Sequence, residues 1–341
     1  MMLLVGLMGL MAVGATAMYG FDTPASDDDE TDPSEAVDGS ASGDETETDG
    51  LADLLDDPDT FEEDSPSALD VQIEGIDWGD AGDDTLTGSD GLDQINGYAG
   101  DDMISGQGAG DVLHGDEGED TLYGDAGNDT LHGEEGNDLL LGGADDDELY
   151  GHDDEDTLYG EAGNDSLVGS GGNDLLFGGS GDDALHGDIG DDTLTGGEGA
   201  DTLFGGWGND LINGPGADGA DDTNVDYLNG GGGDDMIIAG NSDIVTAGEG
   251  ADTIALGDWL GQDHQAEILD YTAAEDSLMV VYDDVGGPDP TLALEADEGN
   301  PDTQHILLNG VRIAAVANAA DLTLDQIVLV GQTAFDAQSA A

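Results

Sequence analysis

Apolar residues recur every nine positions through the middle of this chain. From residue 79 to residue 213 one nonapeptide is repeated fifteen times without a gap. Its eighth position is Leu or Ile in every copy, from Leu86 to Ile212, and it is the only obligatory apolar position. A unit that buries one such side chain cannot fold alone, so neighbouring units must stack to form a continuous core. The pattern therefore predicts a solenoid of short strands.

Glycine and aspartate occupy the other invariant positions. The first residue is always Gly and the sixth is always Asp, while the fourth is Gly except at Ala109, Asp145 and Asp154. The unit reads G-x-x-G-x-D-x-[LI]-x. Glycine adopts the positive φ angles of a tight turn and lets the carbonyl groups of that turn converge on a small object. The aspartate then offers a carboxylate to the same object.

The chemistry of these groups predicts a hard cation between stacked turns. The ligands on offer are carboxylate and backbone oxygens, since the chain has no cysteine and only 6 histidines. Calcium accepts six to eight oxygens in loose geometry, whereas magnesium fits flexible carbonyl turns poorly. In the alternative, a metal-free solenoid, stacked aspartates without counterions would repel one another. Calcium ions are therefore the expected partner.

The repeat resembles that of the repeats-in-toxin (RTX) family, G-G-x-G-x-D-x-U-x, which is a calcium-binding β-helix repeat. Residues 178–186, GGSGDDALH, match it fully, and the resemblance covers about half of the chain. It implies an all-β fold, a parallel β-roll solenoid with two nonapeptides per turn. It also implies that each ion lies between repeat n and repeat n+2 on one edge, which gives roughly a dozen ions at six or more oxygens each.

The resemblance further implies that the sixth-position aspartates are the metal ligands, with turn carbonyls completing each shell. The predicted ligands are Asp84, Asp93, Asp102, Asp111, Asp120, Asp129, Asp138, Asp147, Asp156, Asp165, Asp174, Asp183, Asp192, Asp201, Asp210, Asp235 and Asp252.

Two departures from the family pattern weaken the prediction locally. Position two is often acidic where the family favours Gly, as at Asp116 and Glu134. At position four, Asp145 and Asp154 tolerate left-handed backbone angles better than Ala109 does. The sites near Ala109 and between residues 142 and 156 therefore match the pattern less well.

Charge links the predicted fold to the cation. The chain has 83 acidic residues, a single basic residue, Arg312, and a formal net charge of −82. Such a charge with low hydrophobicity normally predicts disorder, so we expect the calcium-free chain to be largely unfolded and the loaded chain compact. The shortage of Lys and Arg argues against nucleic acid and anionic membrane surfaces as partners. With no cysteine, there is no disulfide framework.

The N-terminal quarter has a different pattern. Residues 2–21 carry no charge and are long enough to span a bilayer. We expect a membrane anchor or a cleaved signal within residues 1–21; the flanking cations that would set the orientation of an anchor are missing. Residues 22–77 form an acidic tract, which predicts an extended, disordered linker. Trp78 then opens the roll and is expected to cap its end.

After residue 213 the array becomes irregular and then ends. Residues 214–229 read as one repeat with a seven-residue insertion, and about three further units extend the roll, predicted over 78–256. Residues 257–341 contain several strand-like runs, and Asn309-Gly310 between two of them is a hairpin signal. They predict a small antiparallel β domain that caps the open end, because the last strand of a solenoid is an exposed edge. The RTX resemblance adds a secretion signal to this tail.

The sequence offers no catalytic constellation. It lacks an H-E-x-x-H motif, a G-x-S-x-G elbow and a cysteine nucleophile. His114, His132 and His186 fall at the outward ninth position, where they could face solvent or pack with Tyr123, Tyr150 and Tyr159. A zinc site needs three or four convergent ligands, and the spacing of eighteen brings together only His114 and His132. No histidine metal site is predicted.

These features favour a non-enzymatic calcium-binding protein, extracellular or tethered to the cell surface, that folds on calcium into a rigid rod with a structural or adhesive role. Its further partners could be a membrane, through residues 2–21, or a surface polysaccharide. Two alternatives remain open at this point. One is a secreted, polysaccharide-modifying enzyme with its activity in the C-terminal domain, and the other is a plain calcium buffer.

Overall fold

The computed structural model describes residues 71–72, 75, 77–214, 224–257, 265–284 and 290–339. These residues all belong to the compact unit Asp64–Ala341. The uncharged segment 2–21 and nearly all of the acidic tract 22–77 lie outside the described residues. Among the described residues, no helix is both long and apolar enough to cross a membrane.

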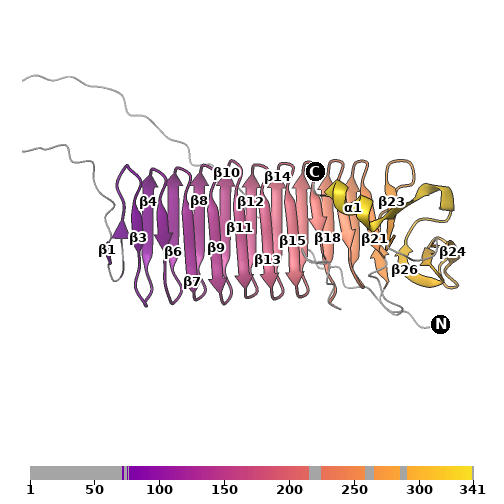
Figure 1. The fold of residues 1–341 in the computed structure, drawn as a ribbon, viewed down its shortest axis with the longest axis horizontal. Helices are drawn as coiled ribbons and strands as arrows, with labels where there is room; N and C mark the ends of the chain where they lie inside the picture. The colour runs from indigo at the N-terminus through magenta and orange to yellow at the C-terminus, as the bar shows by residue number, and fades with distance from the viewer. Residues whose placement is uncertain are drawn as a thin grey trace, which may run out of the picture. The chain divides into compact units, whose positions relative to one another are not determined.

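Two sheets run along this unit on either side of its core, and successive strands alternate between them (Figure 1). The first sheet contains β1 (Val71–Gln72), β3 (Thr85–Thr87), β5 (Met103–Ser105), β7 (Thr121–Ala126), β9 (Leu139–Ala144), β11 (Thr157–Ala162), β13 (Leu175–Ser180), β15 (Thr193–Glu198), β17 (Leu211–Asn213), β19 (Met236–Ala239), β21 (Thr253–Gly257), β23 (Ser277–Tyr282) and β27 (Ile327–Gly331). The second contains β2 (Asp77–Trp78), β4 (Gln94–Ala99), β6 (Val112–Glu117), β8 (Thr130–Glu135), β10 (Glu148–Asp153), β12 (Ser166–Gly171), β14 (Ala184–Ile189), β16 (Thr202–Trp207), β18 (Tyr227–Gly232), β20 (Ile244–Glu249), β22 (Ala266–Ile268), β26 (Val311–Val316), β25 (Gln304–Leu308) and β24 (Leu292–Ala296).

The register confirms the predicted parallel roll. In the second sheet Leu149 of β10 lies opposite Leu131 of β8 and Leu167 of β12, eighteen residues before and after it. Two nonapeptides therefore make one turn, and each repeat stacks on the second repeat after it. Position eight is buried throughout the roll, with 0% exposure from Ile104 to Ile212. Each buried Leu or Ile contributes about 1.5–3 kcal/mol relative to an exposed side chain.

The irregular repeats change the turns and leave the strands in register. Thr202 of β16 pairs with Tyr227 of β18, a step of 25 residues, because the insertion predicted after residue 213 falls between strands. Tyr227 in turn pairs with Ile244 of β20, a step of 17 that absorbs the shortened unit. The hydrophobic column continues through Leu228 and Val245.

The region after residue 257 combines two pairing modes. The predicted antiparallel sheet is present in β24, β25 and β26. Asn309 (φ 53°) and Gly310 (φ 87°) form the predicted hairpin turn between β25 and β26. The parallel pattern nevertheless continues, because β22 pairs with β20 and β26 with β22. In the other sheet β23 pairs with β21 and β27 with β23.

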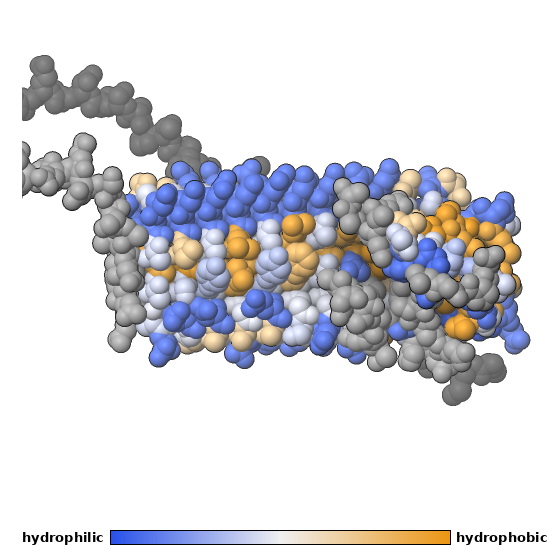
Figure 2. All heavy atoms as spheres, viewed as in Figure 1, coloured by the Kyte–Doolittle hydropathy of each residue, from blue (hydrophilic) through white to orange (hydrophobic). Residues whose placement is uncertain are grey.

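The two ends of the stack differ. At the C-terminal end a 3₁₀ turn, η1 (Leu324–Gln326), precedes β27, and the helix α1 (Gln332–Ser339) follows it. Phe335 of α1 is buried against Ala255 and Val281. At the other end Trp78 pairs through its backbone in β2, but its side chain is 65% exposed, so it does not provide the predicted cap. Figure 2 shows a continuous hydrophilic stripe along one edge of the roll, where the turns of Figure 1 lie.

Candidate metal centre

The turns at the edges of the roll have an unusual backbone. From the third repeat onward, position two adopts a positive φ angle, and so does position four except at Gly172; examples are Glu134 (φ 84°) and Gly136 (φ 126°) of one repeat. The three residues that replace Gly at position four do the same, with φ of 73° at Ala109, 79° at Asp145 and 74° at Asp154. The left-handed conformation expected there is therefore present, and the acidic residues at position two from Asp116 onward adopt it as well.

This backbone directs oxygen atoms toward the space between adjacent turns. A Cβ atom added to Gly124, at position one, would lie 2.5 Å from the carbonyl oxygen of Gly142 and 2.6 Å from Oδ2 of Asp129. A Cβ added to Gly163, at position four, would collide with the carbonyl oxygen of Asp145. Glycine is required because a side chain would fill the place where carboxylate and carbonyl oxygens converge.

The sixth-position aspartates form a ladder along each edge. The backbone N–H of each one donates a hydrogen bond to Oδ1 of the aspartate one turn further on. The bond from Asp138 to Asp156 is 2.9 Å long, and so is the bond from Asp156 to Asp174. All seventeen predicted ligands, from Asp84 to Asp252, are buried, with at most 7% exposure. The ladder thus places one carboxylate per repeat inside the roll.

The second oxygen of these carboxylates is buried without a hydrogen-bond donor among the described residues. This holds for Oδ2 of Asp102, Asp111, Asp120, Asp129, Asp138, Asp147, Asp156, Asp165, Asp174, Asp183, Asp192, Asp210, Asp235 and Asp252. A buried acceptor without a donor is costly, and a buried charge without a partner is more so. The first two predicted ligands differ, since Oδ2 of Asp84 accepts from the backbone of Asp80 and Oδ2 of Asp93 from that of Ser89.

The pKa values of the ladder reflect the same environment. Burial, reinforced by neighbouring carboxylates, raises the pKa of Asp156 to about 8 and that of Asp147 to about 7. The backbone N–H donors oppose this shift but do not cancel it. Without a counterion the ladder would take up protons near neutral pH. An oxygen-only donor set with a surplus of negative charge fits calcium, which prefers carboxylate and carbonyl ligands.

The ladder is longer than the predicted set of ligands. The backbone N–H of Asp201 donates to Oδ1 of Asp226 (2.9 Å), and that of Asp226 to Oδ1 of Asp243 (3.2 Å). Asp252 donates likewise to Asp276 (3.4 Å). The signal that could have found Asp226, Asp243 and Asp276 is the aspartate two residues before an apolar residue, at Leu228, Val245 and Leu278.

The histidines of the ninth position lie outside the ladder, on the outer face of the second sheet. His114 of β6 stacks on His132 of β8 with ring centroids 4.6 Å apart, and His132 stacks on Tyr150 of β10. Tyr123 and Tyr159 lie in strands of the other sheet and do not join this stack. Of the packing expected for the histidines, only that with Tyr150 is present.

Comparison with known families gives one match. A family model described as the RTX calcium-binding nonapeptide repeat matches residues 78–113, 105–140, 132–167, 159–194, 186–214, 221–254 and 240–258. Together these segments cover just over half of the chain. No curated protein matches the sequence.

Proposed function

Because the chain belongs to the RTX calcium-binding nonapeptide repeat family, we propose that it is a non-enzymatic protein that folds on calcium into a rigid roll outside the cell. The observation that carries this proposal is the row of buried aspartate Oδ2 atoms without donors. A folded protein rarely tolerates such atoms unless an ion or water satisfies them. Here they recur at the same position in most repeats from Asp102 onward, so one structural solution must serve all of them.

The residues that would hold calcium follow from this geometry. The carboxylates are the seventeen predicted aspartates, with Asp226, Asp243 and Asp276 as candidates at the irregular end. Carbonyl groups from positions one, two and four of adjacent turns face the same space, as at Gly142 and Asp145. Roughly a dozen ions would have six or more oxygens each. Their charge would offset the repulsion along the ladder, and the chain's own oxygens would set their spacing.

The difference in calcium concentration between the cytosol and the outside of the cell links folding to cellular location. Extracellular modules bind calcium with dissociation constants of about 10⁻⁴–10⁻³ M, which the low calcium of a cytosol does not satisfy. The chain would therefore remain unfolded during export and fold when it meets external calcium. Residues 1–21 would act as an anchor or signal, 22–77 as a linker, 78–256 as the calcium-binding roll and 257–341 as a cap with a role in secretion.

The role that fits best is that of a structural rod. The described sheets are continuous from β1 to β27 and from β2 to β24, so the roll and the cap would form one rigid body on loading. Adhesion to a surface polysaccharide would use the outer faces of these sheets. Under the alternative of an enzyme, full-length loaded protein would turn over a polysaccharide.

Small-angle scattering of full-length protein tests the proposal. Protein stripped of calcium should scatter as an expanded chain, and added calcium at millimolar concentration should compact it and produce the far-ultraviolet dichroism of β-strands. The same concentration of magnesium should give little change, because its octahedral shell fits these turns poorly. Equal compaction in calcium-free buffer would overturn the proposal.

A further inference from the structure

Three of the chain's 6 histidines lie close together on one outer face of the roll. Calcium does not account for them, because it is bound by oxygen ligands and not by imidazole. They lie on three successive strands of the second sheet: His114 on β6, His132 on β8 and His152 on β10. Glu134 of β8 completes the group. We call His114, His132, Glu134 and His152 the histidine patch.

The register of the roll explains how residues 38 positions apart come together. His114 and His132 occupy the ninth position of alternate repeats, so they lie on neighbouring strands, opposite one another. Glu134 and His152 occupy the second position of alternate repeats and are likewise paired. Positions nine and two flank an inward-facing glycine, so both point away from the core. The patch is therefore built from two adjacent columns on one face.

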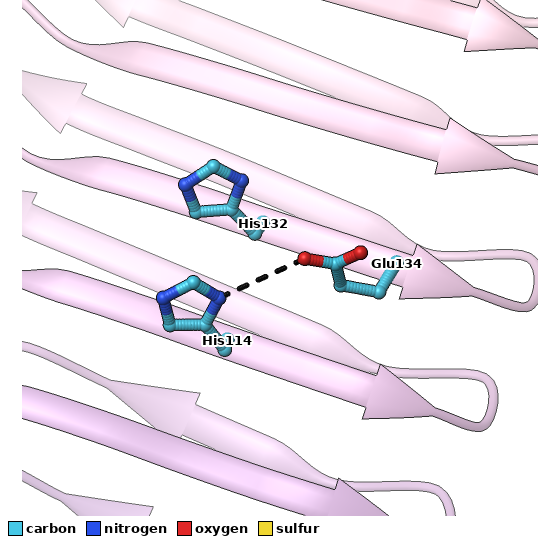
Figure 3. Close-up of side chains that lie close together, drawn as sticks. All are labelled: His114, His132 and Glu134. Atoms are coloured by element: carbon cyan, nitrogen blue, oxygen red, sulfur yellow. Dashed lines mark ion pairs between the residues drawn. The ribbon is translucent and has the colours of Figure 1, made fainter. Parts of the chain in front are cut away.

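Short distances connect the two columns. His132 Nδ1 lies 3.0 Å from His152 Nε2. Glu134 Oε1 lies 3.8 Å from His152 Nε2. It lies 3.9 Å from His114 Nδ1, the ion pair that Figure 3 marks with a dashed line. One ligand atom from each of His114, His132 and Glu134 can be chosen so that all lie within 4.8 Å of one another. In Figure 3 these three side chains stand on the same side of the sheet, with the carboxylate beside the two rings.

From this arrangement we propose that the histidine patch binds one divalent transition-metal ion of the zinc, cobalt or nickel class. Imidazole nitrogens and a carboxylate are the ligands that such ions favour. A tetrahedral zinc ion with bonds of about 2.0–2.1 Å needs ligand atoms roughly 3.4 Å apart. The observed distances between ligand atoms of the patch, from 3.0 to 3.9 Å, span that value. The side chains can adjust, because those of His114, Glu134 and His152 are 25%, 40% and 36% exposed. The strands beneath keep the backbone positions fixed.

The charge around the patch favours a cation over an empty stack of rings. Glu117, Glu135 and Asp153 form an acidic column on the same three strands, one position beyond Glu134 and His152. A surface of one sign raises the local concentration of the opposite ion.

The patch and the aspartate ladder are separate sites. The ladder lies inside the roll and offers only oxygen, whereas the patch lies on the outer face and is mainly nitrogen. Metal at the patch should therefore not displace calcium. Since the patch needs the folded roll, it must be tested in protein whose β dichroism in saturating calcium has first been recorded; failure of that step would concern the proposed function and not the patch.

Cobalt(II) is the probe of choice, because four-coordinate cobalt with nitrogen ligands absorbs visible light strongly and six-coordinate cobalt on surface carboxylates does so weakly. Full-length protein in saturating calcium should develop the four-coordinate spectrum with one equivalent of cobalt, and zinc should abolish it. His132→Ala should weaken binding at least tenfold, and Glu134→Gln several-fold.

His186→Ala is the matched control. His186 occupies the same ninth position on β14 of the same sheet, packs beside Phe204 with the two rings tilted by 45°, and lies outside the patch. Its substitution should leave cobalt affinity unchanged. The proposal fails if wild-type protein shows only the six-coordinate spectrum, in which case the patch is a hydrogen-bonded stack of rings. It also fails if His132→Ala and His152→Ala, both folded in calcium, retain the four-coordinate spectrum.

Discussion

The roll and the C-terminal region satisfy their buried polar groups in opposite ways. In the C-terminal region His305 is 4% exposed, and its two ring nitrogens lie 3.0 Å from Gln265 Oε1 and from Asp297 Oδ2. In the roll Asp156 is 1% exposed and leaves Oδ2 without a donor among the described residues. Tyr271, whose hydroxyl also lacks one, is an exception in the C-terminal region.

One hydrophobic core runs through both regions, but its composition changes along the unit. Each repeat of the roll adds one Leu or Ile beside one buried Asp, whereas the C-terminal region adds Ile306, Ile313, Val316 and Ile327 to the same core. The chain's only cation, Arg312, also lies there, paired with Glu295 at 3.0 Å. The difference teaches that the C-terminal region pairs its buried and charged groups mainly with its own side chains, while the carboxylates of the roll call for an external positive charge.

Removal of calcium should produce the largest effect and should separate the two regions. In chelator, the amides of β10 to β16 should exchange hydrogen at nearly the rate of an unfolded chain, because the ladder would repel itself. The amides of β25 and β26 should keep measurable protection. Hydrogen exchange with mass spectrometry reads both regions in one sample. Equal loss of protection in both would show that the cap depends on the roll, and equal retention would contradict the contrast.

Protons should partly replace calcium in the roll. The folded-state pKa values of Asp147 and Asp156 are raised to about 7 and about 8, above the ordinary 3.8, so the calcium-free fold binds more protons than the unfolded chain. This contribution to stability is complete below about pH 4 and disappears as the pH rises through 7–8. Calcium-free protein should therefore gain β dichroism between pH 8 and pH 5, which stays above its pI of about 4.1. Unchanged dichroism over this range would argue against buried, protonatable aspartates.

A single substitution in the ladder should have opposite effects with and without calcium. Asp156→Asn keeps the oxygen that accepts from Asp138 but removes the charge. In calcium it should cost about 2 kcal/mol, or roughly 4–8 °C in melting temperature, because an ion loses a charged ligand. In chelator it should leave the residual β dichroism unchanged or raise it, because one repulsive charge is gone. Glu155→Gln, the exposed neighbour in the same repeat, is the control; it should change the stability in calcium by no more than about 0.5 kcal/mol and leave the dichroism in chelator unchanged.

The smallest predicted effect concerns the turn geometry. Ala109 adopts φ 73°, which strains an L-residue by about 1–2 kcal/mol, so Ala109→Gly should stabilise the loaded roll by about 0.5–1 kcal/mol. Ala126 in β7 has no positive φ, and Ala126→Gly should instead destabilise by about 0.5–1 kcal/mol. Thermal melts in calcium compare the two. The same sign of change for both variants would contradict the role assigned to position four.

Much of the fold was predictable because the repeat has one period and one buried position. The nine-residue spacing predicted the stacked strands, and the RTX resemblance implied the step of eighteen residues that pairs Leu149 with Leu167. The Asn309-Gly310 turn was predictable from local conformational preference. The continuation of parallel pairing through β22, β23, β26 and β27 was not, because an exposed sheet edge templates strands whose sequence has lost the period. The helix α1 carried no recognisable pattern.

The candidate sites likewise contain residues that the sequence pattern marks and residues that it does not. The sequence pattern marks each aspartate of the regular repeats, and the structure places all of them in the buried ladder; their role as calcium ligands stays a prediction. Asp276 lies past the predicted roll and was missed, although the residue two positions after it is apolar. His152 occupies the second position of its repeat, whereas His132 occupies the ninth position of an earlier one. Their proximity depends on the register of two strands and on which side chains face outward. Neither can be read from the spacing of the two residues along the chain.

The number of calcium ions bound per chain tests the central claim most directly. It can be measured by equilibrium dialysis of full-length protein with elemental analysis, in parallel with circular dichroism of the same samples. The account predicts roughly a dozen ions, taken up over the same range of calcium concentration in which the β dichroism develops. Uptake of only one or two ions at full β dichroism would contradict it.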